Sequence, residues 1–240
     1  MTTLLWGALP YIAFALLVAG LVWRYRYDKY GWTTRSSQIY ESKLLNIASP
    51  AFHYGILFVL AGHLVGLFVP TSWTSAVGVS EHTYHLFSLY GGTFAGALTV
   101  AGLALLLHRR RTRAPVLRAT TTNDKVMYLF LVAAIVLGMT AKLTHTSGDG
   151  YNYRETIAPW ARSLSTLQPR TALMTDVPVL YQVHAVIGMI LIALVPYSRL
   201  VHMFSAPLPY LFRPYVVYRT RDPNQLGPRP ERRGWETTRR

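Results

Sequence analysis

The stretch PAFHYGILFVLAGHLVGLFV, residues 50–69, runs for twenty residues without a single Lys, Arg, Asp or Glu. A helix needs about 20 mostly apolar residues to cross the hydrocarbon core of a bilayer. The stretch is too long for one β-strand, and its apolar residues do not alternate with a period of two. It therefore predicts a membrane-spanning helix that carries His53 and His63.

Four further apolar runs have the same character. They cover residues 4–23, 86–107, 126–143 and 177–201. No basic residue precedes the first run, and its apolar part is long for a signal peptide, so we interpret it as a retained helix. The sequence thus predicts an all-α membrane protein with five transmembrane helices. The polar loop at about 144–176 is expected to carry a short amphipathic helix.

The composition excludes several other classes of protein. Of the 240 residues, 51% are hydrophobic and 14% are charged, against roughly 25% charged residues in soluble domains. So high a hydrophobic content excludes intrinsic disorder. The absence of cysteine excludes a disulfide-stapled fold, a thiolate-bound iron–sulfur cluster or zinc, and a cysteine nucleophile. Any bound metal must therefore use histidine, carboxylate or methionine ligands.

The basic residues gather on one side of the predicted membrane. The formal net charge is +14, and 20 of the 24 Lys and Arg residues follow the first run, follow the third run, or lie from Arg199 onward. Because Lys and Arg favour cytoplasmic loops, we expect the N-terminus outside and the C-terminus in the cytoplasm. The charge is thus a topology signal, and no nucleic-acid partner is expected.

The charge distribution also suggests a division of the chain. We expect a five-helix membrane domain at 1–202 and a cytoplasmic tail at 203–240 that is rich in Pro and Arg. Such a tail cannot form a long helix, because proline interrupts helical hydrogen bonding. It is expected to dock on partner subunits, with binding to anionic lipid headgroups as the alternative.

Four histidines lie within or at the ends of the predicted helices, where ionisable groups are costly and mark function by default. His53 and His63 are ten residues apart, about 15 Å along a helix, whereas His184 and His202 are 18 residues apart, about 27 Å. Antiparallel helices would pair His63 with His184 and His53 with His202.

Two such bis-histidine pairs at two depths are what two stacked b-type haems require. The unequal spacings require helix tilt or a kink at Pro196. A zinc site fits less well, because its four ligands would have to converge on one point. The simplest alternative is that each histidine only hydrogen-bonds a neighbouring helix.

Several stretches resemble one family. They are WRYRYDKYGWTTRSSQ (23–38), NIASPAFHYGILFVLAGHLVGLFVP (46–70), RATTTNDK (118–125) and VHAVIGMILIALVPYSRLVHMFSAPLPYLFR (183–213). They are similar to the gamma subunit, a dihaem cytochrome b, of the membrane-bound respiratory nitrate reductase. The resemblance implies that His63 and His184 bind the iron of an outer haem b. It implies that His53 and His202 bind the iron of an inner one.

The resemblance also implies an oxidoreductase function. The family's gamma subunit oxidises quinol at the outer side of the cytoplasmic (inner) membrane of a prokaryote. Electrons then pass inward through the two haems to an iron–sulfur subunit. From there they reach a molybdenum subunit, which reduces nitrate to nitrite.

The sequence departs from the family at the expected quinol pocket. The family has a lysine just before its third helix, and Thr83 stands at that position here. Histidine can both hydrogen-bond quinol and accept its proton. Our hypothesis is that His82 or His85 takes the lysine's role beside Gly62 and His63, the alternative being that both are solvated loop residues.

Haem propionates need cationic or hydroxyl partners. Arg199, Arg110 and Tyr25 lie at helix ends on the predicted cytoplasmic side and are candidates for this contact. Positive-inside anchoring explains the two arginines equally well.

Two alternative functions remain from the sequence. One is a dihaem anchor for another quinone-linked oxidoreductase, such as a formate dehydrogenase or a hydrogenase. The other is a proton channel or transporter that uses the four histidines as a relay. The presence or absence of a b-type haem spectrum separates the second from the haem hypothesis.

Overall fold

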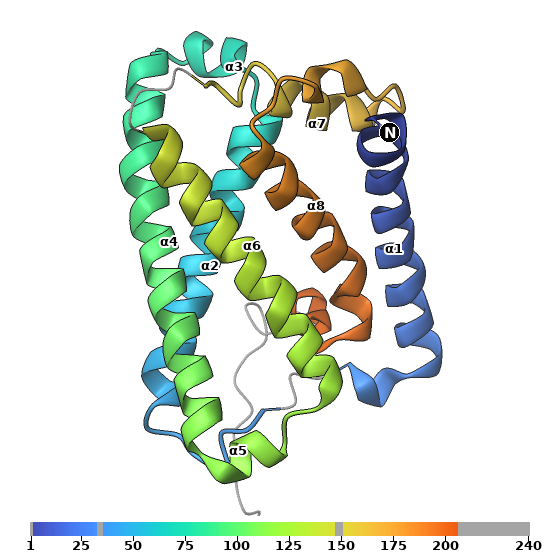
Figure 1. Ribbon diagram of the computed structural model, residues 1–240, viewed down its shortest axis with the longest axis vertical. Helices are drawn as coiled ribbons and strands as arrows, with labels where there is room; N and C mark the ends of the chain where they lie inside the picture. Colours follow the sequence, from blue (N-terminus) through green and yellow to red (C-terminus); the bar gives the residue numbers. More distant parts are fainter. Residues whose placement is uncertain (1, 33–35, 147–150, 206–240) are drawn as a thin grey trace, which may run out of the picture. The chain divides into compact units, whose positions relative to one another are not determined.

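The computed structural model describes residues 2–32, 36–146 and 151–205, and these ranges contain helices and no strand (Figure 1). The long helices are α1 (Leu9–Tyr27), α2 (Leu45–Phe68), α4 (Glu81–Thr112), α6 (Thr122–Thr146) and α8 (Val179–Leu194). The short helices are α3 (Thr71–Ala76), α5 (Ala114–Arg118) and α7 (Ile157–Ser165).

The chain divides into one unit at 1–205 and a second at 206–240, which lies outside the described residues. Most of the expected tail at 203–240 therefore remains a prediction.

Five helical segments of the described ranges are long and apolar enough to cross a membrane, which confirms the predicted number. They are Leu4–Tyr27, Leu45–Phe68, Glu81–Thr112, Thr122–Thr144 and Val179–Tyr197. The first begins with a π-helical turn at Leu4–Ala8. The side chains along these segments are largely exposed, as in Phe58 at 68% and Phe94 at 72%. Such exposure suits contact with lipid rather than with water.

The fifth segment is not one continuous helix, so the prediction for 177–201 was wrong at its end. The α-helix stops at Leu194, and Val195–Tyr197 forms a single 3₁₀ turn. Ser198 is extended, with φ −121° and ψ 178°, before a second 3₁₀ segment at Arg199–Ser205. Pro196 explains the break, because it has no N–H to donate and its ring clashes with the preceding helical turn.

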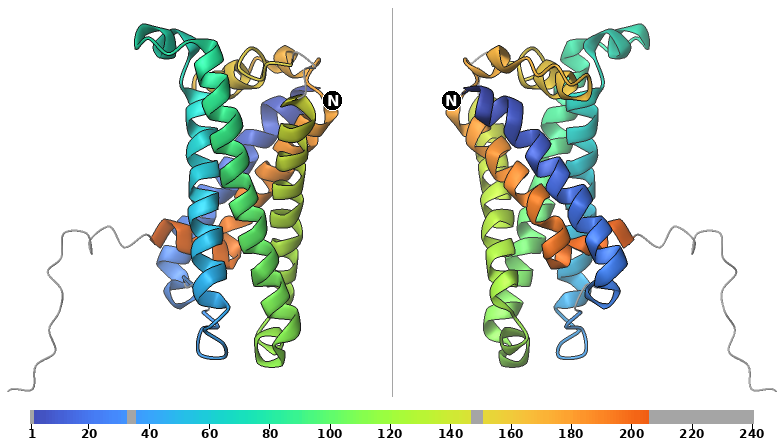
Figure 2. Two further views of the ribbon diagram at one scale, coloured as in Figure 1. Left: turned by 90° about the vertical axis from the view of Figure 1, so that its left-hand side faces the viewer. Right: turned by 90° about the vertical axis from the view of Figure 1, so that its right-hand side faces the viewer.

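The helices form a series of neighbours rather than a closed bundle. α2 packs on α4, α4 on α6, α6 on α8, and α8 on α1, as Figures 1 and 2 show. Glycine allows the closest contact, between α2 and α4: a Cβ at Gly55 would lie 2.7 Å from the Thr99 backbone nitrogen. α2 and α8 are both fully described, and they pack much less closely on each other than the neighbouring pairs do.

One end of the molecule, which we call the α7 end, is covered by α7 and α3 (Figure 1). The apolar face of α7 is buried, and the Trp160 ring meets the Trp6 ring edge-on at 5.6 Å between centroids. The Trp160 Nε1–H donates to the Trp6 carbonyl at 2.9 Å. These contacts confirm the predicted amphipathic helix in the loop after α6 and fasten it to the first spanning segment.

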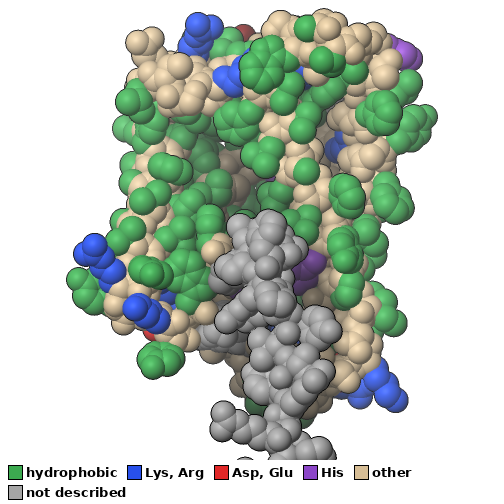
Figure 3. Space-filling model, turned by 180° about the vertical axis from the view of Figure 1, so that it is seen from behind, with side chains coloured by type: hydrophobic (Ala, Val, Ile, Leu, Met, Phe, Trp, Pro, Cys, Tyr) green, Lys and Arg blue, Asp and Glu red, His purple; other side chains and the backbone are tan. Residues whose placement is uncertain are grey.

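The opposite end, the α5 end, is held by a buried ion pair. The side chain of Arg109, only 2% exposed, donates to Glu41 and to the Ser37 hydroxyl and carbonyl. This ties the loop before α2 to the end of α4. From behind, hydrophobic side chains cover much of the visible surface between the two ends, and most of the visible Lys and Arg side chains lie toward those ends (Figure 3). The same view shows a hollow in the middle of this face.

Candidate cofactor site between α2 and α8

The structure brings the four predicted histidines together in two pairs. The rings of His63 on α2 and His184 on α8 have centroids 6.0 Å apart, with 38° between their planes. The rings of His53 on α2 and His202 in the Arg199–Ser205 segment are also 6.0 Å apart, with 66° between their planes. The pairing matches the one expected from antiparallel helices, and each pair lies at its own depth.

Three of the four imidazoles are held in one tautomer. The Nδ1 atoms of His53, His63 and His202 lie 2.8, 2.7 and 2.6 Å from the backbone carbonyls of Ser49, Val59 and Arg199. Because a carbonyl oxygen only accepts, each Nδ1 carries the proton and each Nε2 presents its lone pair. Histidines that bind metals are usually oriented in this way by a backbone or carboxylate partner.

The fourth ring, that of His184, is the most enclosed. Its Nδ1 atom is buried, and the nearby Ala134 carbonyl does not complete a hydrogen bond of normal geometry with it. A Cβ placed at Gly138 of α6 would lie 2.8 Å from the His184 Cε1 atom. A glycine at position 138 is therefore what gives the imidazole its place beside α6.

The spacing of each pair fits one metal atom between two imidazoles. A metal–imidazole bond is about 2 Å and the ring nitrogen lies about 1 Å from the ring centre, so two opposed ligands have centres about 6 Å apart. Within the described ranges no three His, Asp or Glu side chains converge as a metal-binding group. The donor set therefore suits a metal that takes two axial imidazoles, as haem iron does.

The space around the pairs suits a large planar group. α2 buries only small residues, Ala48, Gly55 and Gly66, and most of its other side chains are exposed. His53 and His63 are among the exposed ones, although each approaches a ring across the interval between α2 and α8. Two pairs of imidazoles thus lie where α2 packs only loosely on α8.

The break in the fifth segment explains how both pairs can form. On a continuous helix His184 and His202 would be about 27 Å apart, too far to match His53 and His63 at about 15 Å on α2. A departure from a straight helix at Pro196 was expected from these unequal spacings, and the structure has a complete break there. The extended Ser198 redirects the chain, so His202 reaches its partner from a separate 3₁₀ segment.

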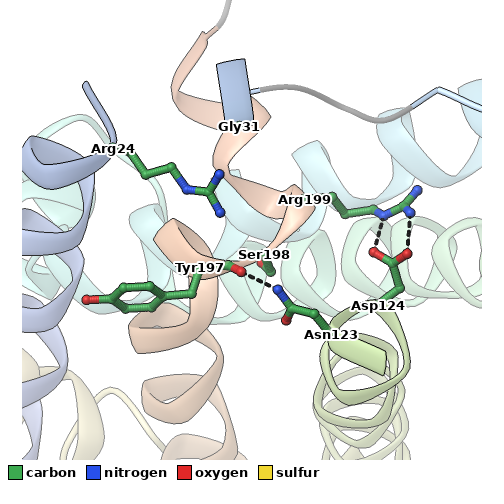
Figure 4. Close-up of a pocket in the computed structure, with 7 residues that line it drawn as sticks. All are labelled: Arg24, Gly31, Asn123, Asp124, Tyr197, Ser198 and Arg199. Carbon is green, nitrogen blue, oxygen red and sulfur yellow. Dashed lines mark hydrogen bonds and ion pairs between the residues drawn. The ribbon is translucent and has the colours of Figure 1, made fainter. Parts of the chain in front are cut away.

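A polar cluster at the α5 end fixes that redirected segment (Figure 4). Arg199 donates to both carboxylate oxygens of Asp124 at 2.8 and 2.6 Å, and Asp124 is buried. Arg24 Nε donates to the Pro196 carbonyl at 2.6 Å, and the Asn123 amide donates to the Tyr197 carbonyl. These side chains hold both sides of the break and thereby the position of His202.

The residues predicted to contact haem propionates have other partners. Arg199 is paired with Asp124. Arg110 donates to the Thr120 hydroxyl at 2.7 Å and lies over the Tyr128 ring. Tyr25 is 66% exposed and its ring faces Trp32 at 6.4 Å between centroids. Propionate contact by any of the three stays a prediction.

The predicted quinol-site residues lie at the start of α4. His82, Thr83 and His85 are all exposed. Thr83 takes part in the helix cap: its backbone N–H donates to Ser80 Oγ at 3.1 Å, and the two hydroxyls are 2.9 Å apart. Gly62 has open space beside it, with no atom within 4 Å of a Cβ placed there. The roles of these residues stay predictions.

A second polar cluster fixes this start of α4 at the α7 end. Arg154 donates to both carboxylate oxygens of Glu81 at 3.0 and 3.2 Å and lies 3.8 Å from the centre of the Tyr84 ring. The Tyr84 and Tyr153 hydroxyls are 3.3 Å apart, and Tyr153 packs on Gly66. Burial, reinforced by Tyr84, raises the pKa of the Tyr153 phenol, which stays neutral.

Two contributors to the site, Asp124 and Gly138, escaped the sequence reasoning. Asp124 had a usable signal, because an acidic residue at the edge of an apolar run is unusual. Gly138 had none, since glycine is frequent in membrane helices.

Comparison with known proteins identifies a set of relatives. Residues 2–221 match the family model described as nitrate reductase gamma subunit. Over 237 residues the chain is 57% identical to the nitrate reductase-like protein NarX of Mycobacterium tuberculosis, covering 98% of this chain but only 36% of that relative. It is 38% identical to the nitrate reductase gamma chain of Bacillus subtilis, covering 91% and 98% of the two chains. Identity to the respiratory nitrate reductase 1 gamma chain of Escherichia coli is 35%, covering 88% and 94%.

Proposed function

Because the chain belongs to the nitrate reductase gamma subunit family, we propose that it is the dihaem cytochrome b subunit of a respiratory nitrate reductase. The observation that carries the proposal is the pair of bis-histidine arrangements, each 6.0 Å between ring centroids. His53, His63 and His184 lie on segments long and apolar enough to span a membrane, and His202 lies in the Arg199–Ser205 segment that follows the last of them. A dihaem anchor of another quinone-linked enzyme would need the same pairs, and family membership favours nitrate reductase.

In this proposal the four imidazoles bind two b haems, which supply one-electron redox chemistry at two depths. His63 and His184 hold one iron through Nε2, and His53 and His202 hold the other. The carbonyls of Ser49, Val59 and Arg199 keep three of the rings in the required tautomer. Gly138 keeps the fourth ring in place by leaving room for it.

The family resemblance implies inward electron flow, and the proposed orientation assigns the two ends of that path. The α5 end, where most basic residues of the described chain lie, faces the cytoplasm by the positive-inside rule. Quinol then loses two electrons and two protons near the α7 end, close to His63 and His184. The electrons leave near His53 and His202 for an iron–sulfur subunit and a molybdenum subunit. Each charge that crosses is worth about 2.3 kcal/mol per 100 mV.

The local geometry does not favour a histidine proton relay. His53 and His63 are ten residues apart on α2, about 15 Å, which is too far for direct proton transfer. Their Nδ1 protons are already committed to backbone carbonyls.

The test is a visible spectrum of the purified full chain in detergent. Dithionite-reduced-minus-oxidised spectra should show b-type bands, with two haems per chain and two steps in a redox titration. A chain that folds without any b-type band, and that conducts protons in liposomes, would contradict the proposal and support the relay.

A further inference from the structure

One ionisable group inside the spanning helices has no role in the proposed electron path. Lys142 lies within the Thr122–Thr144 span of α6 and is half-buried. A lysine within a membrane helix is costly and usually faces a functional site or an aqueous cavity. We therefore expect Lys142 to have a function besides helix packing.

The side chain of Lys142 reaches across to α4. A Cβ placed at Gly92 would lie 2.9 Å from Lys142 Cε and 3.0 Å from Nζ. Any larger residue at position 92 would displace the ammonium group. Glycine here keeps a lysine close to the α4 backbone, at the seam where α4 and α6 pack.

This seam is next to the His63–His184 pair. Gly138, which contacts the His184 ring, precedes Lys142 by four residues on the same face of α6. Four residues of α-helix rise about 6 Å, so Lys142 lies one turn beyond the ring contact, toward the α7 end. Lys142 thus follows the glycine that contacts His184 by one helical turn, while its own side chain contacts α4.

A lipid-soluble molecule could reach the seam from the bilayer. Gly92 and Lys142 are only partly buried, and no atom lies within 4 Å of a Cβ placed at Gly91. Beside them on α4, Phe87 and Phe94 are 76% and 72% exposed. A lipid-soluble molecule would thus reach the Lys142 ammonium group at this seam along an apolar surface.

Three of the residues predicted to bind quinol, His82, Thr83 and His85, lie at the start of α4 and away from Gly92. Thr83 precedes Gly92 by nine residues, about 14 Å along α4, and its hydroxyl is engaged with Ser80. Lys142 thus offers a cation about 14 Å deeper than the position where the family carries its lysine.

We propose that Lys142 is a quinol-binding residue, donating a hydrogen bond from Nζ to a quinol oxygen beside the His63–His184 pair. The proposal rests on the dihaem function above. As quinol becomes quinone it loses two protons to water at the α7 end and two electrons, which the haem that His63 and His184 would hold would accept one at a time and pass on. Lys142 keeps its own proton, and its charge stabilises the oxyanion left by the first deprotonation. An ammonium has three N–H donors, so its other contacts can remain.

The experiment compares the wild-type complex with Lys142→Met, Lys142→Arg and Lys125→Met. Lys125 is the matched control, because it is an exposed lysine at the other end of the same helix. The probe is 2-heptyl-4-hydroxyquinoline N-oxide, a quinol analogue whose fluorescence is quenched on binding. Haem content is measured in parallel from the dithionite-reduced spectrum.

We expect Lys142→Met to weaken binding of the probe by about tenfold or more, the scale of one hydrogen bond to a charged group. Lys142→Arg should retain part of the affinity, and Lys125→Met all of it. Haem content should not change in any variant. Gly92→Ala gives a second test, because it keeps the lysine but places a methyl group 3.0 Å from Nζ; it should also weaken binding.

Wild-type affinity in Lys142→Met or, should that variant not fold, in Gly92→Ala would overturn the proposal. A shift in outer-haem potential with unchanged probe affinity would also overturn it, since Lys142 would then act only through its charge. Absence of haem from the wild-type chain would refute the dihaem function instead, so the two failures are distinguishable.

Discussion

Gly138 of α6 lies directly against the imidazole of His184 on α8, so that a Cβ at position 138 would come within 2.8 Å of Cε1. Real Cβ atoms essentially never approach a neighbour so closely, and one of the two groups would have to move. A backbone position on one helix therefore sets the orientation of a proposed metal ligand on another. The local sequence of neither helix predicts this contact.

Gly138→Ala should displace the His184 ring and reduce outer haem while leaving inner haem in place. The expected spectrum contains close to one haem per chain, with one step in the redox titration. Val136→Ala is the control, because Val136 lies on the same helix, two residues before Gly138, and its side chain is 54% exposed. It should keep both haems. Two normal haems in Gly138→Ala would show that the contact has no bearing on ligation.

Single histidine variants should remove one haem at a time. His63→Ala or His184→Ala should abolish one step of the redox titration, and His53→Ala or His202→Ala the other. The physical reason is that each iron has its own two axial imidazoles, at separate depths. His108→Ala, which removes an exposed histidine of α4, should leave both steps intact. Loss of both steps in every variant would mean that the pairs are not independent sites.

Asp124→Asn should destabilise the α5 end and reduce inner haem. The substitution leaves the Arg199 guanidinium without its buried carboxylate partner, and breaking a buried pair costs roughly 3–5 kcal/mol. Thermal unfolding in detergent, followed by circular dichroism, should show a lower midpoint.

The double variant Asp124→Asn, Arg199→Gln serves as the control for that experiment. Removing both charges leaves neither one unpaired, so its midpoint should lie above that of Asp124→Asn alone. Equal midpoints for the single and double variants would argue that the pair itself does not position the Arg199–Ser205 segment.

The attachment of the loop before α2 should weaken on acidification. The Leu44 N–H and the Arg109 guanidinium hold the pKa of Glu41 below its ordinary value of 4.5. A carboxyl group whose pKa is lower in the folded than in the unfolded protein stabilises the folded state when the pH is above its unfolded-state pKa. This stabilisation is lost as the pH falls through the folded-state pKa. Hydrogen exchange of the Ser37–Leu44 backbone should therefore differ between wild type and Glu41→Gln at pH 6. The difference should shrink as the pH falls below 4.5 and Glu41 becomes protonated, and a difference that does not change with pH would exclude Glu41 as its source.

The number of spanning helices could be predicted because it depends on local composition. A run such as residues 50–69 is apolar whatever surrounds it, and only helices satisfy the backbone in a bilayer without partners. The pairing of His63 with His184 and His53 with His202 also followed from the sequence, since antiparallel helices fix the order of depths. The end of α8 did not follow, because Pro196 can either kink a helix or end it. Whether the helix kinks or ends at Pro196 depends on partners from elsewhere in the chain. Arg24 and Asn123 donate to the backbone carbonyls of Pro196 and Tyr197, before the break, and Asp124 accepts from Arg199 after it.

The sequence by itself determined the helical membrane fold, the five spans and which histidines share a depth, because hydrophobicity and helical period are properties of consecutive residues. Only the tertiary structure decided the contacts between Gly138 and His184, Gly92 and Lys142, and Asp124 and Arg199. These pairs are 46, 50 and 75 positions apart in the chain. They depend on which helices are neighbours and at what rotation, and no periodicity within a single helix encodes that.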